Sequence, residues 1–242
     1  MKCRGLSVIL AMALVAGCEG NTPTPTPSQA VAVAPSAPPV AAPVAAPVAA
    51  PVSGPERRVL AFGDSLFAGY RLGSRESYPA KLETALRAQG INARVTNAGV
   101  SGDTSAAGRQ RLTFVLGSMP ARPDLAIVEL GGNDLLRGIA PSETGANLTA
   151  ILDELKRRNV PVLLMGMRAP PNMGDAFVAE FDGLYPRLAR QYGTALVPFF
   201  MEPIYGKPAL QQADHVHPTA AGVDAMVAAT ADDVAKALPK AP

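Results

Sequence analysis

The chain has 242 residues, and its 22 Lys and Arg against 20 Asp and Glu give a net charge of +2. No basic cluster stands out and tryptophan is absent, so a nucleic-acid-binding function has no electrostatic basis. The two cysteines, Cys3 and Cys18, lie near the start of the chain, which excludes thiol catalysis and a disulfide framework for the rest of it.

The first eighteen residues predict a signal peptide. Lys2 and Arg4 precede an apolar run over residues 6–16, which is too short to span a bilayer, since spanning needs roughly 20 residues. The run ends in Val-Ala-Gly and Cys18, which resembles a bacterial lipoprotein cleavage site with Cys18 as the lipidated residue. Glu19 follows where an inner-membrane lipoprotein would carry aspartate. We therefore expect an exported lipoprotein on the periplasmic side of the envelope, with the outer membrane favoured. The alternative is an ordinary secretory signal in which Cys18 is incidental.

Residues 19–57 are rich in Pro, Ala and Val and contain Pro-Val-Ala-Ala repeats over residues 39–50. Repeated prolines remove backbone donors and prevent helix or sheet formation. Such a segment is a semi-rigid spacer of ~3.1 Å per residue when extended. We expect a disordered tether, in preference to a ligand for a proline-recognising partner, and a single domain over residues 58–242.

The domain alternates apolar runs with amphipathic stretches. The expected strands are residues 58–62, 93–97, 125–130, 160–167 and 195–200. The expected helices are residues 78–89, 104–116, 148–155, 178–188 and 219–238, with Asp103 as the candidate cap of the second. This alternation predicts an α/β fold in which helices cover both faces of a parallel sheet.

Four short clusters occur in a fixed order in this domain. They are residues 63–66 (Gly-Asp-Ser-Leu), 101–104 (Ser-Gly-Asp-Thr), 131–134 (Gly-Gly-Asn-Asp) and 214–218 (Asp-His-Val-His-Pro). The first three follow expected strands, and therefore fall at the carboxyl edge of the sheet, where open α/β sheets bind ligands. The fourth precedes the last helix and can fold back over the same edge.

Ser65 is the candidate nucleophile, although a residue in this position can also cap the next helix. A serine hydroxyl needs a base, and the chain has only two histidines, His215 and His217. We assign His217 as general base and then general acid, and Asp214 as the carboxylate that orients it. His215 is expected to be a partly exposed loop residue. A metal site built from His215 and His217 is the alternative, but metal sites use three or four ligands and only Asp214 is nearby as a third.

The tetrahedral intermediate of acyl transfer needs hydrogen-bond donors for its oxyanion. The backbone N–H groups of Ser65 and Gly102 and the side-chain amide of Asn133 are the candidates, although tight-turn geometry alone can explain Gly102 and Asn133. Three neighbouring carboxylates are expected to cap helices or support the site without transferring protons: Asp64, Asp103 and Asp134.

The four clusters resemble the SGNH (GDSL) hydrolases, a family named after the residues found here as Ser65, Gly102, Asn133 and His217. Three longer stretches are similar to the branch of thioesterase I, also known as a protease and lysophospholipase, and of bacterial arylesterases. These stretches are residues 68–71 (Ala-Gly-Tyr-Arg), 128–138 and 198–202 (Pro-Phe-Phe-Met-Glu). The family pattern carries glycine or another residue in place of His215, which supports His217 as the catalytic histidine.

The resemblance implies a flavodoxin-like three-layer α/β/α sandwich with a five-stranded parallel sheet. It also implies a serine esterase that needs no metal or cofactor and hydrolyses aryl esters, short- to medium-chain acyl esters, acyl thioesters and lysophospholipids through an acyl-enzyme. We expect a monomer whose partners are a small acyl ester or thioester and, through Cys18, a membrane. Residues 135–141 and 168–174 are expected to wall the acyl groove. The alternatives are an envelope polysaccharide O-acetyl esterase and a non-catalytic tethered binding module.

Overall fold

The computed structural model describes residues 52–240 of the chain. The expected signal peptide, Cys18 and the expected tether up to residue 51 therefore lie outside the described residues. The first strand begins at Arg57, one residue before the domain boundary expected from the sequence. Just before it, the carbonyl of Gly54 accepts a hydrogen bond from the Asn92 side chain at 2.9 Å, so the last residues assigned to the tether already contact the domain.

All five strands of the sheet are parallel, in the order β2-β1-β3-β4-β5. Their bounds are β1 (Arg57–Gly63), β2 (Ala93–Gly99), β3 (Leu125–Glu129), β4 (Val162–Met165) and β5 (Ala195–Val197). Because all five strands run in the same direction, their carboxyl ends lie at one edge of the sheet, and the connections between them carry helices. The expected five-stranded parallel sheet is confirmed.

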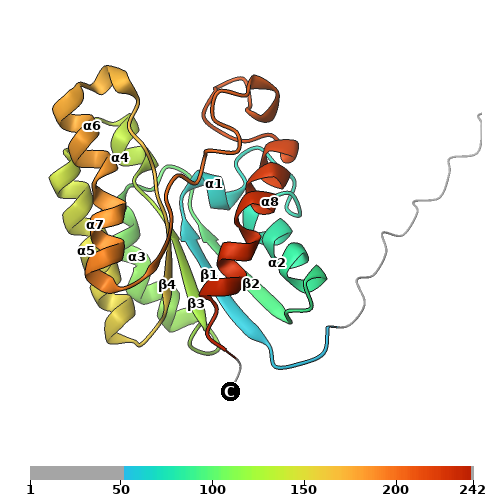
Figure 1. Cartoon of the computed structure of the whole chain (residues 1–242). Helices are drawn as coiled ribbons and strands as arrows, with labels where there is room; N and C mark the ends of the chain where they lie inside the picture. The colour runs from blue at the N-terminus through green and yellow to red at the C-terminus, as the bar shows by residue number, and fades with distance from the viewer. Residues whose placement is uncertain (1–51, 241–242) are drawn as a thin grey trace, which may run out of the picture. The chain divides into compact units, whose positions relative to one another are not determined.

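Helices cover both faces of this sheet (Figure 1). One layer holds α1 (Ser65–Ala68), α2 (Tyr78–Ala88) and α8 (Ala220–Ala237). The other holds α3 (Ser105–Ser118), α5 (Pro141–Arg157), α6 (Asp175–Asp182) and α7 (Leu184–Tyr192). Three short helices lie in connections: α4 (Gly132–Leu136), η1 (Pro171–Met173) and η2 (Pro208–Leu210). The three-layer α/β/α sandwich is confirmed.

The central strands are buried on both sides, which is why they read as continuous apolar runs. Val59, Leu60, Ala61 and Phe62 of β1 are fully buried, as are most residues of β3. On α5 the buried positions are those of the expected helical spacing: Leu148, Ile151, Leu152 and Leu155. Each such side chain contributes about 1.5–3 kcal/mol of burial free energy.

Three local expectations are wrong. The helix expected over residues 178–188 is two helices, α6 and α7, which meet at Gly183, a residue that weakens helix propagation. The strand expected to end at residue 200 ends at Val197, since Pro198 has no N–H for the ladder. Asp103 does not cap α3. Thr104 does, its side chain accepting from the N–H of Ala107.

Within residues 52–240, none of the helices combines the length and the apolar character that crossing a membrane requires.

Candidate active site

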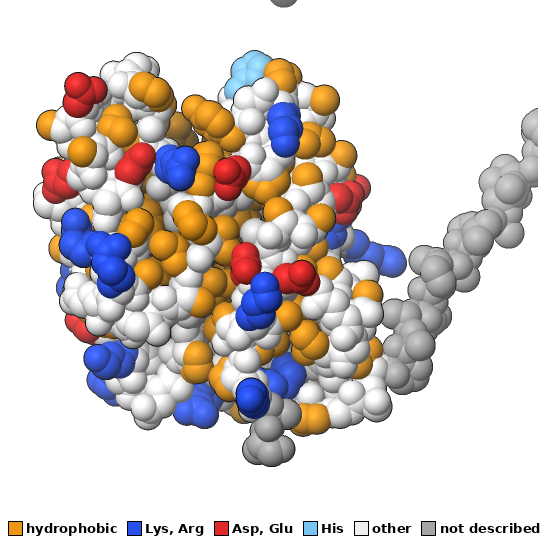
Figure 2. Space-filling view, viewed as in Figure 1, with side chains coloured by type: hydrophobic (Ala, Val, Ile, Leu, Met, Phe, Trp, Pro, Cys, Tyr) orange, Lys and Arg blue, Asp and Glu red, His pale blue; other side chains and the backbone are white. Residues whose placement is uncertain are grey.

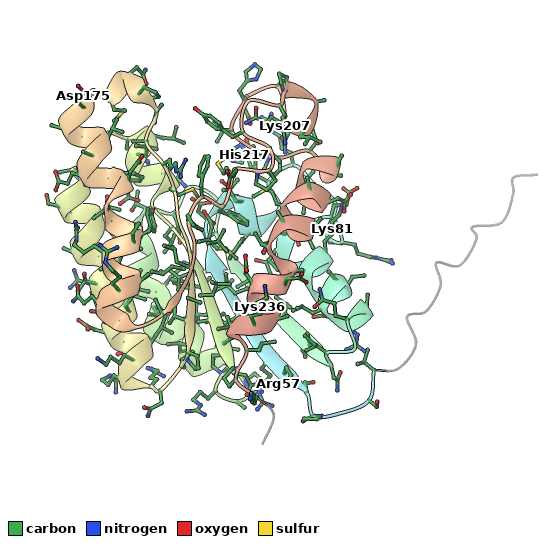
Figure 3. The ribbon with its side chains drawn as sticks, viewed as in Figure 1. Arg57, Lys81, Asp175, Lys207, His217 and Lys236 are labelled. Atoms are coloured by element: carbon green, nitrogen blue, oxygen red, sulfur yellow. The ribbon has the colours of Figure 1, made fainter. Side chains whose placement is uncertain are left out.

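The four sequence clusters converge at the carboxyl edge of the sheet. Three of them follow β1, β2 and β3, and the fourth belongs to the segment of residues 211–218, here called the histidine loop. This loop lies between η2 and α8, and Figure 3 shows His217 on it, above the carboxyl ends of the strands. The convergence expected from strand order is therefore present.

Ser65 is the first residue of α1, directly after the end of β1. Asp64 caps this short helix, because its Oδ1 accepts from the N–H of Leu66 at 3.0 Å. The capping role thus falls to Asp64, as expected, and leaves the Ser65 hydroxyl available. Ser65 is 9% exposed, so its hydroxyl is accessible only from the crevice.

Ser65, His217 and Asp214 form a continuous chain of contacts. Nε2 of His217 lies 2.8 Å from Oγ of Ser65, and Nδ1 lies 2.9 Å from Oδ2 of Asp214. The Ser65 hydroxyl also lies 3.5 Å from Asp64 Oδ1, but its single proton favours the shorter contact with the imidazole. The tautomer that accepts from the serine at Nε2 is the one that donates from Nδ1 to the carboxylate. This arrangement prepares the serine to lose its proton.

Asp214 is held as an anion by its own loop. Its Oδ1 accepts from the backbone N–H groups of Val216 and His217, at 3.0 Å each. Partial burial acts to raise the pKa of Asp214, but these two N–H groups and the His217 ring outweigh it and lower the pKa to about 2. Asp214 is therefore ionised at any pH near neutrality.

Two further side chains hold the histidine loop against the helical layer. The Tyr70 ring lies 4.3 Å from the His217 ring, centroid to centroid. Gln212 Nε2 donates to the carbonyls of Tyr70 and Pro218, at 2.9 Å each. Sequence reasoning assigned neither residue a role, and only Tyr70 stood in a stretch quoted for the family resemblance.

His215 is exposed and has a positive φ of 56°. The expectation that it is an exposed loop residue is confirmed, although it also borders the cavity described below. In the part of the chain that the structure describes, no three His, Cys, Asp or Glu side chains are grouped so as to hold a metal ion.

The candidate oxyanion donors differ in how closely they approach Ser65. Asn133, in α4, lines the same cavity as Ser65, and its Nδ2 donates to Asp64 Oδ2 at 3.0 Å. Gly102 lies in the loop after β2 with φ +87°, and its carbonyl accepts from the Arg137 guanidinium at 2.9 Å. Of the described residues, Gly102 is not among those that line the cavity. The structure thus places Asn133, but not Gly102, in the lining of the cavity that contains Ser65.

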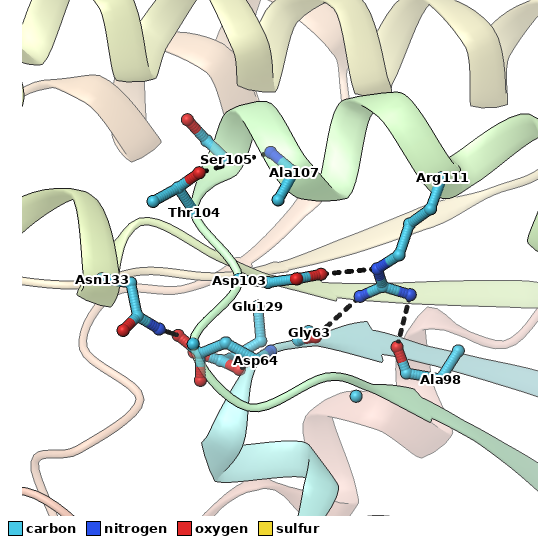
Figure 4. A network of polar contacts seen from close by, with 12 residues as sticks. Gly63, Asp64, Ala98, Asp103, Thr104, Ser105, Ala107, Arg111, Glu129 and Asn133 are labelled. Atoms are coloured by element: carbon cyan, nitrogen blue, oxygen red, sulfur yellow. Dashed lines mark hydrogen bonds and ion pairs between the residues drawn. The ribbon is translucent and has the colours of Figure 1, made fainter.

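Arg111 of α3 holds the ends of β1 and β2 and the loop after β2 together (Figure 4). Its guanidinium pairs with Asp103 at 2.5 Å and donates to the carbonyls of Ala98 and Gly63 at 2.8 and 2.9 Å. It also lies 4.2 Å above the Phe62 ring. Asp103 therefore supports the site through Arg111. Sequence reasoning missed Arg111, and no local pattern marks it.

Asp134 fixes the start of α3. Its carboxylate accepts from the N–H and the hydroxyl of Ser105, at 2.7 and 2.5 Å, and from the Thr144 hydroxyl at 3.2 Å. These buried contacts join α3, α4 and α5 below the site. The supporting role expected of Asp134 is confirmed.

A cavity of about 230 Å³ opens beside Ser65. Of the segments expected to wall it, residues 135–141 contribute Leu135 and Leu136, and residues 168–174 contribute Arg168 and Pro170. Sequence reasoning missed a third wall, formed by Phe199, Met201 and Tyr205. Figure 2 shows a notch between the two shoulders of the molecule with hydrophobic side chains around it. The cavity suits an apolar group attached to a reacting carbonyl.

A larger hollow, of about 440 Å³, lies near the amino ends of β4 and β5. The described residues that line it include Lys156 and Tyr192 but no serine or histidine, so it has no nucleophile and base to pair.

At the carboxyl edge of the parallel sheet, a serine is hydrogen-bonded to an imidazole, and the imidazole is hydrogen-bonded to a carboxylate. This arrangement is typical of an α/β serine hydrolase. Comparison with known proteins gives the family. Residues 61–225 match the model of the GDSL-like lipase/acylhydrolase family, and the chain belongs to that family.

Two relatives and one solved structure illustrate the similarity. Esterase TesA of Pseudomonas aeruginosa is 40% identical over 67% of this chain and 80% of its own length. The "Thioesterase 1/protease 1/lysophospholipase L1" of Escherichia coli is 42% identical over 66% of this chain and 74% of its own. The crystal structure of AlinE4, described as an SGNH-hydrolase family esterase, is 65% identical, covers 77% of this chain and 99% of its own, and gives a TM-score of 0.66. The chain is accordingly a carboxylic ester hydrolase of the serine type.

Proposed function

We propose that this serine esterase works through an acyl-enzyme formed on Ser65, with His217 as general base and Asp214 as the group that orients it. The observation that carries the proposal is the 2.8 Å contact between His217 Nε2 and Ser65 Oγ, continued by the 2.9 Å contact from Nδ1 to Asp214. A non-catalytic binding module has no need of this chain of contacts.

In the first half-reaction, Ser65 Oγ attacks the carbonyl carbon of the ester while His217 Nε2 takes its proton. The imidazolium that forms is stabilised by the Asp214 carboxylate. The negative oxygen of the tetrahedral intermediate is held by the Ser65 and Gly102 N–H groups and by Asn133 Nδ2, and one such donor is typically worth about 10²–10³ in turnover. His217 then protonates the leaving oxygen or sulfur, and the acyl-enzyme remains.

In the second half-reaction, His217 removes a proton from water, which attacks the acyl carbonyl. The tetrahedral intermediate collapses as His217 returns the proton to Ser65 Oγ, and the carboxylic acid is released. No step requires a metal or a cofactor, because the base, the acid and the oxyanion donors all come from the chain.

The substrates proposed are aryl esters, short- to medium-chain acyl esters, acyl thioesters and lysophospholipids. The apolar walls formed by Leu135, Met167, Phe199 and Met201 support an acyl or aryl group in the cavity. Relatives named as a thioesterase and lysophospholipase and as an arylesterase support the same range. An O-acetyl esterase acting on polysaccharide would need polar groups for the sugar, and these walls offer few.

Labelling with a fluorophosphonate tests the nucleophile. We expect one adduct on the parent and none on Ser65→Ala, whose ester turnover falls about 10³-fold or more with little change in unfolding temperature. Ser101→Ala is the matched control, since Ser101 is an exposed serine of a neighbouring loop and does not line the cavity. A folded parent that forms no adduct, or an equal loss in Ser101→Ala, would contradict the proposal.

We also propose that the chain is exported and lipidated at Cys18, with the Pro-rich residues 19–57 as spacer, and that it acts as a monomer at the outer membrane. The support is the sequence pattern, together with a set of reacting groups that comes complete from one chain. Metabolic labelling with a fatty-acid analogue, followed by membrane fractionation, tests the anchor. Label and membrane association should both be lost in Cys18→Ser, and equal label on that variant would overturn the assignment.

A further inference from the structure

The strand beneath the serine ends in a buried carboxyl group that the reaction steps above do not use. Glu129 closes β3, has no exposed surface, and is the charged residue in an otherwise apolar strand. Its Oε2 accepts from the backbone N–H of Asp64 at 3.1 Å. Within the described part of the chain, its Oε1 has no hydrogen-bond partner. Burial of an ionised carboxylate with an unpaired oxygen destabilises a fold, and the cost is smaller when the carboxyl is protonated and neutral.

Gly63 makes room for this carboxyl. A side chain at Gly63 would place its Cβ 2.6 Å from Glu129 Oε2, which no real contact tolerates. The Gly-Asp-Ser sequence therefore does more than turn the chain. It brings the Glu129 carboxyl directly against the backbone of Asp64, next to the nucleophile (Figure 4).

Asp64 and Glu129 cannot both be ionised, because two adjacent buried carboxylates repel each other in a poorly solvated site. The donors decide where the single charge lies. The Asp64 side chain accepts from Leu66 N–H and Asn133 Nδ2, both at 3.0 Å, whereas the Glu129 side chain accepts only from the Asp64 N–H. The charge therefore belongs on Asp64 and the proton on Glu129.

The surroundings favour the same assignment. Burial, followed by the charge of Asp64, raises the pKa of Glu129 well above its ordinary value. Burial also raises the pKa of Asp64, but the hydrogen bonds from Leu66 N–H and Asn133 Nδ2 oppose that effect. The other titratable and charged groups near these carboxyls are the buried Tyr185 of α7 and Asp134 of α4, His217 of the histidine loop, and Arg111 of α3, whose guanidinium binds the Gly63 carbonyl.

The state of Asp64 determines which way the Asn133 amide faces. A carboxylate can only accept, so it must meet the Nδ2 of the amide, and the second N–H of that nitrogen stays free. A protonated Asp64 can instead donate to Oδ1, which would flip the amide and turn its oxygen toward the developing oxyanion. The protonation state of Asp64 thus decides whether Asn133 is a donor.

We propose that Glu129, a neutral carboxylic acid that accepts from the Asp64 N–H, is a positioning residue: it leaves the negative charge to Asp64 and thereby holds the Asn133 amide with an N–H toward the oxyanion. The inference rests on the proposed role of Asn133 in the reaction. Glu129 itself touches neither substrate nor reacting atoms.

Two substitutions at Glu129 separate this role from simple packing. Glu129→Met keeps the volume but cannot accept from the Asp64 N–H. We expect kcat to fall 10- to 100-fold with KM within threefold, because the Asn133 donor that it positions acts on the transition state. Glu129→Gln is neutral and can still accept from the Asp64 N–H through its carbonyl oxygen, so it should recover most of that loss. Tyr78→Phe, which removes a buried hydrogen bond to Thr230, is the control for lost stability without a change in kcat.

A double-mutant comparison tests whether Glu129 acts through Asn133. If Glu129 acts through Asn133, adding Glu129→Met to Asn133→Ala should lower kcat by no more than about twofold further, since coupled residues are not additive. Asp64→Asn should behave in the same way, and it keeps the test open if Glu129→Met does not fold. Multiplicative losses in the Asn133→Ala background, equal losses in Glu129→Gln and Glu129→Met, or a fully active Asp64→Asn would each overturn the inference. A failure of the proposed function is distinguishable, since the parent itself would then form no fluorophosphonate adduct.

Discussion

The two sides of the active site are held in different ways. The nucleophile corner, defined as residues 63–65 with Glu129, is built into the core: Asp64 is 2% exposed and Glu129 fully buried. The histidine loop, residues 211–218, lies at the surface, and the Asp214 side chain is 32% exposed. The corner is fixed by contacts between distant strands and helices, whereas most bonds of the loop join residues a few positions apart.

This difference separates stability from activity. In the nucleophile corner, the groups that place the serine also pack the sheet, so damage to those groups, as distinct from loss of the Ser65 hydroxyl itself, should affect folding and turnover together. In the histidine loop, Asp214 and His217 are oriented by a local turn that buries little apolar area. Changes there should abolish turnover while the domain stays folded.

Gly63→Ala should give the largest combined effect. The new Cβ would lie 2.6 Å from Glu129 Oε2 and 2.8 Å from the Phe67 ring, and strain of this kind in a packed core costs about 1–3 kcal/mol or more. We expect a loss of that size in the free energy of unfolding, measured with urea, and a parallel loss of ester turnover. Gly117→Ala on α3 is the matched control, because nothing lies within 4 Å of its Cβ and alanine favours helix by about 1 kcal/mol. An unchanged unfolding midpoint in Gly63→Ala would show that the corner is not tied to the core.

Asp214→Asn should abolish turnover without unfolding the protein. Without the carboxylate, the imidazole is neither oriented nor stabilised as a cation, and kcat should fall about 10³- to 10⁴-fold. His215→Ala is the control in the same loop and should keep kcat within about threefold. Steady-state kinetics on a short-chain aryl ester measures both, and a collapse in His215→Ala equal to that of His217→Ala would overturn the assignment of the base.

The same variant gives a smaller effect that depends on pH. The pKa of Asp214 is lowered to about 2, below the ordinary 3.8, so its ionised form stabilises the fold above about pH 4, and this contribution is lost as pH falls toward 2. Because the side chain is partly exposed, we expect the contribution to be below about 1 kcal/mol. The unfolding temperature of the parent should exceed that of Asp214→Asn at pH 5, and the two should converge toward pH 2. A gap that widens on acidification would contradict the lowered pKa.

Much of the molecule could be predicted from local sequence patterns. The apolar runs gave the positions of all five strands, although β4 and β5 are shorter than expected because Pro161 and Pro198 cannot donate to the ladder. The helical spacing of residues 178–188 was correct for which side chains are buried but did not reveal the break at Gly183. A periodic sequence pattern indicates which face of a helix is buried, but it does not indicate where one helix ends and the next begins.

In the active site, too, some features could be predicted from the sequence and others are seen only in the structure. Ser65, His217 and Asp214 were recognisable because each stands in a short cluster whose residue types suit one chemistry, and because the chain offers so few histidines. Gly102 and Asn133 were recognised in the same manner, but only the structure shows Asn133 at the cavity and Gly102 outside its lining.

The sequence by itself thus determined the alternation of the five strands with the main helices along the chain, the edge at which the clusters meet, and the candidate serine and base. Those properties depend on patterns a few residues long. The tertiary structure alone decided that Arg111 reaches the end of β1, that Phe199, Met201 and Tyr205 form a wall, and that Glu129 lies against Asp64. These contacts join residues dozens of positions apart, and the protonation state of a buried carboxyl depends on its surroundings, which only the packed fold fixes.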